Sequence, residues 1–220
     1  MEEVIKRIAS KVQSHLSDAE GGHDWWHIHR VWKNALLIAQ EEDVNQDIVS
    51  LAALLHDIAD PKFHNGDESI GPRLTKEWLE KEGVDHGTIE HIVNIVKHMS
   101  FKNSFEGKSW SSPELLVVQD ADRLDAIGAI GIARAFSYGG HKQRAMYDPQ
   151  VAPMTEMTKE QYKSSTSPTI NHFYEKLLKL KGLMNTKTAS SIAQERHDFM
   201  IAYLDQFYKE SGAPPTWHNV

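Results

Sequence analysis

Apolar residues recur along most of the chain at intervals of three and four positions, the spacing of one face of an α-helix. In the first segment Val4, Ile8, Val12 and Leu16 follow one another at intervals of four. No stretch of any length shows the alternation of apolar and polar residues that indicates a half-buried strand. The pattern predicts helices over residues 2–16, 25–42, 46–59, 67–82, 86–99, 113–126, 128–137, 168–180 and 187–209.

Residue types at the ends of these segments support the predicted boundaries. Asp24 can cap a helix that begins at residue 25, and Pro113 suits a first helical turn. Pro61 is expected to end the third helix, because the residue before a proline is disfavoured in the α conformation. The stretch 139–167, rich in Gly, Pro, Ser and Thr, is predicted to be irregular, and long loops of this kind are often functional.

The composition indicates one helical domain covering residues 1–220. The chain is 40% hydrophobic, and no linker rich in Pro, Gly or Ser separates two self-sufficient apolar patterns. It has no cysteine, which excludes disulfides, thiolate zinc sites and cysteine nucleophiles. A formal charge of −7 argues against binding to nucleic acid polymers, although small phosphorylated ligands need only a local basic group. No apolar segment is long enough to span a membrane or to serve as a signal peptide, so a cytoplasmic protein is expected.

The pair His56-Asp57 stands at the end of the apolar run 48–55. An imidazole and a carboxylate beside such a run are costly unless they have a partner, and a divalent metal ion can accept both. Two further His-Asp pairs, whose surroundings favour structural or surface roles, are His23-Asp24 and His197-Asp198.

Two segments on other helices can supply the remaining ligands. "HDWWHIHRVW" contains His23, His27 and His29, and "VVQDADRLDA" contains Asp120, Asp122 and Asp125. His27 shares a helix face with Val31 and Ile38, and Asp122 follows Val118 by four positions. Helical spacing therefore favours His27 and Asp122 and leaves the other candidates open.

The three segments in this order resemble the HD-domain superfamily of metal-dependent phosphohydrolases, above all its small stand-alone bacterial branch. The resemblance rests on "HIHRVW", "LLHDIAD" and "VVQDADRLDA" and covers residues 20–140 or so. It implies an all-α, single-domain helical bundle with a metal cleft between helices. The C-terminal helices over 168–210 would pack on this motif-bearing core.

Carried over position by position, the resemblance implies four metal ligands: His27, His56, Asp57 and Asp122. Two imidazoles and two carboxylates suit one divalent ion per chain, with Mn²⁺ favoured and Co²⁺, Ni²⁺, Fe²⁺, Zn²⁺ or Mg²⁺ as alternatives. The competing interpretation is a buried polar cluster held by internal hydrogen bonds.

Three more residues are predicted to act in catalysis. Asp60 follows His56 by four positions, so a continuous helix would place it one turn along as a general acid/base or a water-positioning group. Its alternative role is to end the helix before Pro61. Lys62 can bind a phosphate or remain a solvated lysine. His98, at the end of its helix, can stabilise charge in the transition state or simply cap that end.

These features favour hydrolysis of a phosphate ester or phosphoanhydride in a small molecule, and the family resemblance implies a nucleotide. The predicted reaction splits a nucleoside triphosphate, deoxynucleotides included, into the monophosphate and pyrophosphate. The main alternative is a phosphomonoesterase acting on nucleoside monophosphates. Less favoured are a di-iron oxygenase, which would need further histidines such as His86, His91 and His98, and a nucleotide-sensing module without turnover. The protein is expected to act as a monomer or homodimer, apart from membranes and nucleic acid.

Overall fold

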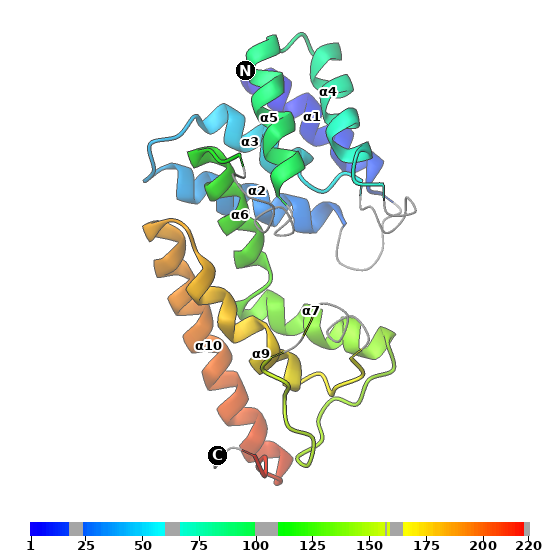
Figure 1. Cartoon of the computed structure of the whole chain (residues 1–220), viewed down its shortest axis with the longest axis vertical. Helices are drawn as coiled ribbons and strands as arrows, with labels where there is room; N and C mark the ends of the chain where they lie inside the picture. Colours follow the sequence, from blue (N-terminus) through cyan, green and yellow to red (C-terminus); the bar gives the residue numbers. More distant parts are fainter. Residues whose placement is uncertain (18–23, 60–66, 100–109, 157, 159–164, 218–220) are drawn as a thin grey trace. The chain divides into compact units, whose positions relative to one another are not determined.

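The computed structural model describes residues 1–17, 24–59, 67–99, 110–156, 158 and 165–217. Within these ranges it contains helices and no strand, which confirms the all-α prediction (Figure 1). The helices are α1 (Glu2–His15), α2 (Trp25–Ala39), α3 (Gln46–Leu55), α4 (Ile70–Lys81), α5 (His86–His98), α6 (Pro113–Asp125), α7 (Gly128–His141), α9 (Asn171–Glu175), the 3₁₀ helix η3 (Leu177–Leu183) and α10 (Lys187–Ser211).

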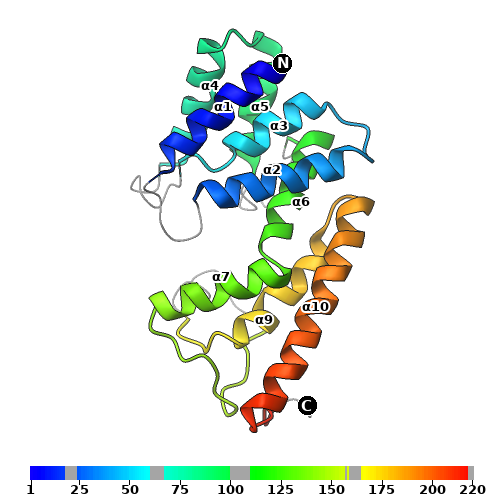
Figure 2. The same cartoon turned by 180° about the vertical axis from the view of Figure 1, so that it is seen from behind.

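Contacts along the chain define two compact units, Met1–Asp122 and Arg123–Val220. The expected extent of a single domain over 1–220 therefore stays a prediction. In the first unit α3 packs against α1, α2 and α5, and α4 packs against α5 (Figures 1 and 2). This central position explains the apolar run, because every residue of α3 from Ile48 to Leu55 is buried.

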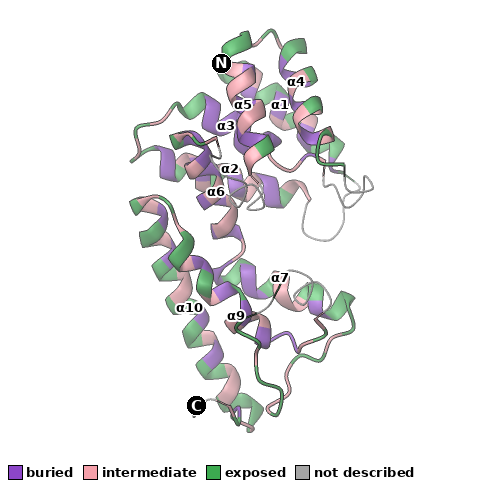
Figure 3. Cartoon of the chain, viewed as in Figure 1, coloured by how far each residue is buried: buried purple, intermediate pink, exposed green. Residues whose placement is uncertain are grey.

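The second unit is built around α10, which packs against α7 and η3, while η3 also packs against α9. Its core contains Phe173, Met200 and Leu204, all nearly or fully buried (Figure 3). The buried carboxylate of Asp125 forms an ion pair with Arg134. This pairing compensates for removing the carboxylate from water.

The predicted helix over 46–59 is wrong at its end, because α3 stops at Leu55 and His56 is the residue that caps it. The His56 ring bonds back to the Ala53 carbonyl, which satisfies one of the carbonyls left free at a helix end. The spacing argument for Asp60 assumed a helix that continued past His56, so it does not hold. Asp60 itself lies outside the described residues.

Other boundaries also differ from the sequence prediction: α2 ends at Ala39 rather than at 42, and α4 begins at Ile70 rather than at 67. The helix expected over 128–137 continues through Gly139 and Gly140 to His141. Gly139 permits close packing there, since a Cβ on it would lie 2.2 Å from the Thr169 hydroxyl oxygen. In place of one helix near 168–180 there are α9 and η3, separated by Lys176, whose φ of −141° is not helical.

None of the described helices combines the length and apolar character that a membrane-spanning segment requires.

Candidate metal centre

Helix α2 presents His27 on its buried side. The Asp24 carboxylate caps this helix and accepts a hydrogen bond of 2.9 Å from the backbone N–H of His27 itself. His27 is 2% exposed and lies on the same apolar face as Val31 and Ile38, which are fully buried. The sequence thus anchors the His27 backbone by a cap and its side chain by the core.

The end of α3 presents His56. Its Nδ1 lies 2.8 Å from the Ala53 carbonyl oxygen. Because a carbonyl oxygen can only accept, Nδ1 must carry the proton, and Nε2 keeps its lone pair in the neutral ring. A backbone carbonyl that orients an imidazole in this way is a frequent outer partner of metal-binding histidines.

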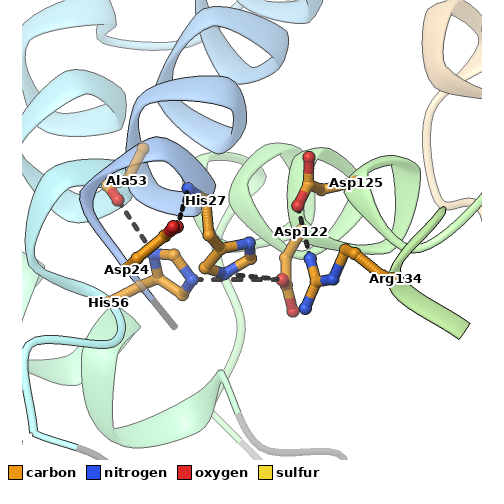
Figure 4. A network of polar contacts seen from close by, with 7 residues as sticks. All are labelled: Asp24, His27, Ala53, His56, Asp122, Asp125 and Arg134. Atoms are coloured by element: carbon orange, nitrogen blue, oxygen red, sulfur yellow. Dashed lines mark hydrogen bonds and ion pairs between the residues drawn. The ribbon is translucent and has the colours of Figure 1, made fainter. Parts of the chain in front are cut away.

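Three side chains from these two helix ends converge. His27, His56 and Asp57 each offer one ligand atom, and these atoms lie within 4.8 Å of one another. Asp122, from α6, approaches the same imidazoles, with Oδ1 at 3.6 Å from His27 Nε2 and at 4.0 Å from His56 Nε2 (Figure 4). The structure therefore brings together all four residues that the sequence selected.

The geometry of this group fits a divalent ion. Asp122 Oδ1 lies farther from both imidazole nitrogens than a hydrogen bond allows. The imidazole side chains are 3% and 5% exposed, whereas that of Asp122 is 44% exposed. Mixed nitrogen and oxygen ligands suit Mn²⁺, Fe²⁺, Co²⁺, Ni²⁺ or Zn²⁺. The exposed carboxylate marks a side of the group where water or a phosphate oxygen could bind.

The other candidates in the two ligand segments have different surroundings. His29 lies among three tryptophan rings, those of Trp25, Trp26 and Trp32, at centroid distances of 5.7, 5.7 and 6.3 Å. Burial, and then the charges of Lys33 and Arg30, lower the pKa of His29. His23 lies outside the described residues, Asp120 is fully buried, and Asp125 pairs with Arg134.

Of the three predicted catalytic residues, only His98 is described; Asp60 and Lys62 lie outside the described residues. His98 Nδ1 donates to the Asn94 carbonyl at 2.8 Å, and its ring packs at 5.5 Å from that of Trp110. Its backbone carbonyl accepts a bond from Gln119, three residues before Asp122 on α6. The tautomer of His98 is thus fixed as that of His56 is, and its catalytic role stays a prediction.

Two partners of His56 and His98 were not predicted from the sequence. The Ala53 carbonyl acts through its backbone, so no residue type could have indicated it. Trp110 contacts both His98 and His91, at 5.5 Å in each case. The two histidines lie seven residues apart on α5, and no pattern in the sequence indicated the ring that packs against both.

Comparisons with known proteins identify the family of this chain. Residues 25–127 match the model of the HD domain. An HD-superfamily hydrolase from Bacillus thuringiensis has a crystal structure with 42% identity and a TM-score of 0.77, covering 96% of this chain and 98% of that one. A structure from Lactobacillus plantarum has 41% identity and a TM-score of 0.77, with 97% and 99% covered.

The uncharacterized protein YpgQ of Bacillus subtilis is 37% identical over 208 residues, which cover 93% of this chain and 92% of YpgQ. Its crystal structure in complex with ADP has a TM-score of 0.74, with 94% and 95% covered. Matches of this identity and coverage, together with the HD-domain match, confirm the resemblance inferred from the three sequence segments. The chain belongs to the HD-domain superfamily of metal-dependent phosphohydrolases.

Proposed function

We propose that His27, His56, Asp57 and Asp122 bind one divalent ion, Mn²⁺ by preference, and that the protein hydrolyses nucleoside triphosphates to monophosphate and pyrophosphate. The observation that carries this proposal is the convergence of two buried imidazoles and two carboxylates, one of them open to solvent. The ADP complex of YpgQ supports a nucleotide as the ligand. Deoxynucleoside triphosphates are included among the proposed substrates.

The reaction adds water across the bond between the α and β phosphates. The water oxygen bonds to the α phosphorus, the bridging oxygen leaves with pyrophosphate, and the water proton passes to a base. A bound divalent ion supplies charge stabilisation and a water of lowered pKa. The base proposed here is Asp60, with Lys62 on a phosphate oxygen and His98 near developing charge.

The chain's own contacts prepare the ligands for this task. The Asp24 cap holds the backbone of His27, and the Ala53 carbonyl keeps His56 in the tautomer that directs a lone pair outward from Nε2. Ligands that are oriented before the ion binds need less reorganisation, so they should bind it more tightly.

The first experiment is a panel of nucleoside tri-, di- and monophosphates with several divalent metals, in which phosphate and pyrophosphate are measured separately. Pyrophosphate release from triphosphates is expected. Release of orthophosphate from monophosphates would favour the phosphomonoesterase, and two irons per chain would favour an oxygenase. Release of neither phosphate nor pyrophosphate with any metal would refute the proposal.

The second experiment replaces Asp57 by Ala. Its matched control is the same change at Asp198, in the pair His197-Asp198 on α10. Asp57→Ala is expected to remove bound metal and at least about a hundred-fold of turnover, because loss of a ligand removes both affinity and charge stabilisation. Asp198→Ala, on the exposed side of α10, should change neither. In Asp57→Ala, both the metal content measured by elemental analysis and the turnover should fall. An Asp57→Ala protein that keeps its metal and activity would disprove the site.

A further inference from the structure

A group of basic residues lies where the turn after α7 meets α9 in the second unit. The group, called the basic cluster below, consists of Lys142, Arg144, His172 and Lys176. Tyr138, in the last turns of α7, is 51% exposed. The Lys142 ammonium lies 5.7 Å from the centre of its ring, and the Arg144 guanidinium carbon lies 5.5 Å from it. Two cations therefore pack against one exposed aromatic ring.

The turn after α7 holds Lys142 and Arg144 in this arrangement. The N–H of Arg144 donates to the Gly139 carbonyl, and the N–H of Gln143 donates to the Gly140 carbonyl. These two bonds form a Schellman motif, in which the residue between the basic pair takes a left-handed conformation. That residue is Gln143, with φ of 54°, rather than the usual glycine. A strained backbone of this kind often accompanies a functional site.

The other two members of the basic cluster are His172, which lies on α9, and Lys176, which follows this helix. The backbone N–H groups of Thr169 and Ile170 donate to the carbonyls of Ala145 and Met146. These bonds hold the residues just before α9 beside the segment that follows Arg144. Lys176 follows His172 by one turn. Burial, and then the positive charges of Lys176 and Arg144, lower the pKa of His172 to about 4. Arg144 and Lys176 thus bring positive charge to the place where the two segments meet, and the His172 ring beside them is neutral near pH 7.

The described part of the chain does not neutralise the two cations that face Tyr138. Neither Lys142 nor Arg144 forms an ion pair with an acidic side chain among the described residues, although the chain has 31 acidic and 24 basic residues. Arg144 donates from Nη2 to the Ser165 carbonyl, which uses one of the five N–H donors of a guanidinium. Donors and charge remain for an anion.

We propose that the basic cluster is a phosphate-binding site, which takes the phosphate groups of a free nucleotide or of inorganic pyrophosphate. A guanidinium matches two phosphate oxygens at once, and lysine supplies a compact charge beside it. All residues of this site belong to the unit Arg123–Val220.

The test measures binding of pyrophosphate and of ATP by calorimetry, with metal removed by chelation and in the Asp57→Ala background. These conditions keep the metal centre from contributing, so the two proposals can fail separately. Arg144→Gln is expected to weaken binding by about ten-fold or more, equivalent to the loss of roughly one charge-assisted hydrogen bond. Lys142→Met should weaken it less, and Lys209→Met, an exposed lysine on α10, should leave it unchanged.

A second readout reports on the site without relying on any substitution. An anion bound beside Arg144 and Lys176 would offset their positive charges, so the pKa of His172 should rise when pyrophosphate is added. Nuclear magnetic resonance of the histidine ring can follow this change. Tighter binding of ATP than of pyrophosphate would identify a nucleotide as the ligand, and equal binding would identify the phosphate groups alone. Absence of binding up to millimolar pyrophosphate, or equal affinity of Arg144→Gln and the parent, would overturn the proposal.

Discussion

At the scale of single residues, backbone carbonyls decide how two histidines can act. His56 and His98 both donate from Nδ1 to a carbonyl within their own helix end, that of Ala53 and that of Asn94. Each ring is thereby left with Nε2 as its accepting nitrogen. Two other histidines have different surroundings. His29 packs against tryptophan rings, and His172 lies near the cations Lys176 and Arg144.

His172 should make the protein less stable in mild acid. Its pKa is about 4 in the folded protein, below the ordinary value of about 6.5 expected after unfolding. Between these values the unfolded chain binds a proton that the folded chain does not. Stability should therefore be lost as the pH falls through this range, by up to about 1.4 kcal/mol per pH unit.

Urea unfolding at several pH values between 7 and 4 would measure this contribution. Since carboxylates also affect acid stability, the comparison is with His172→Gln, which should lose less stability than the parent over the same range. Parallel curves for the two proteins would show that His172 does not carry this pH dependence.

At the scale of helices and turns, most of the structure could be predicted from the sequence. The spacing of apolar residues located the helices, and Asp24 and Pro113 marked two starts correctly. Tertiary contacts determined what the sequence missed. The end of α3 depends on the His56 side chain, and the length of α7 depends on packing between Gly139 and Thr169.

The candidate metal centre was likewise predicted only in part from the sequence. Helical spacing favoured His27 and Asp122 because each was expected on the inner face of a regular helix. That reasoning failed for Asp60, where the regular helix had already ended. The basic cluster was only partly visible in the sequence, since His141, Lys142 and Arg144 are neighbours along the chain. Lys176 and His172 join Lys142 and Arg144 only through the fold.

Gln143 offers a test of the turn after α7. Glycine adopts a positive φ without the steric cost that a Cβ brings, so Gln143→Gly should raise the free energy of unfolding by about 1 kcal/mol. Gln143→Ala keeps the Cβ and is the matched control, with no such gain expected. Chemical denaturation of the three proteins would measure the difference, and an alanine variant as stable as the glycine variant would contradict the assigned strain.

At the scale of the whole molecule, all four proposed ligands belong to the unit Met1–Asp122, and the basic cluster belongs to the unit Arg123–Val220. Helix α6 contains the boundary, with Asp122 as the last residue of one unit and Arg123 as the first of the other.

Addition of Mn²⁺ should slow amide hydrogen exchange in α2, α3 and α6 and leave α9 and α10 largely unchanged. Binding to the folded state alone stabilises it by about 2.7 kcal/mol when the free ion is at a hundred times its dissociation constant. Mass spectrometry of peptic fragments would locate the effect, with Asp57→Ala as the control that should show none. Slower exchange confined to α10 would place the ion elsewhere.

The three tryptophans around His29 have a practical consequence for optical measurements. Half of the chain's six tryptophans, Trp25, Trp26 and Trp32, lie on α2, the helix that also carries His27. Trp26 is 60% exposed, whereas its two neighbours on that helix are more enclosed. Intrinsic fluorescence is therefore weighted toward this helix, and quenching by a paramagnetic ion such as Mn²⁺ gives a label-free titration of the metal centre.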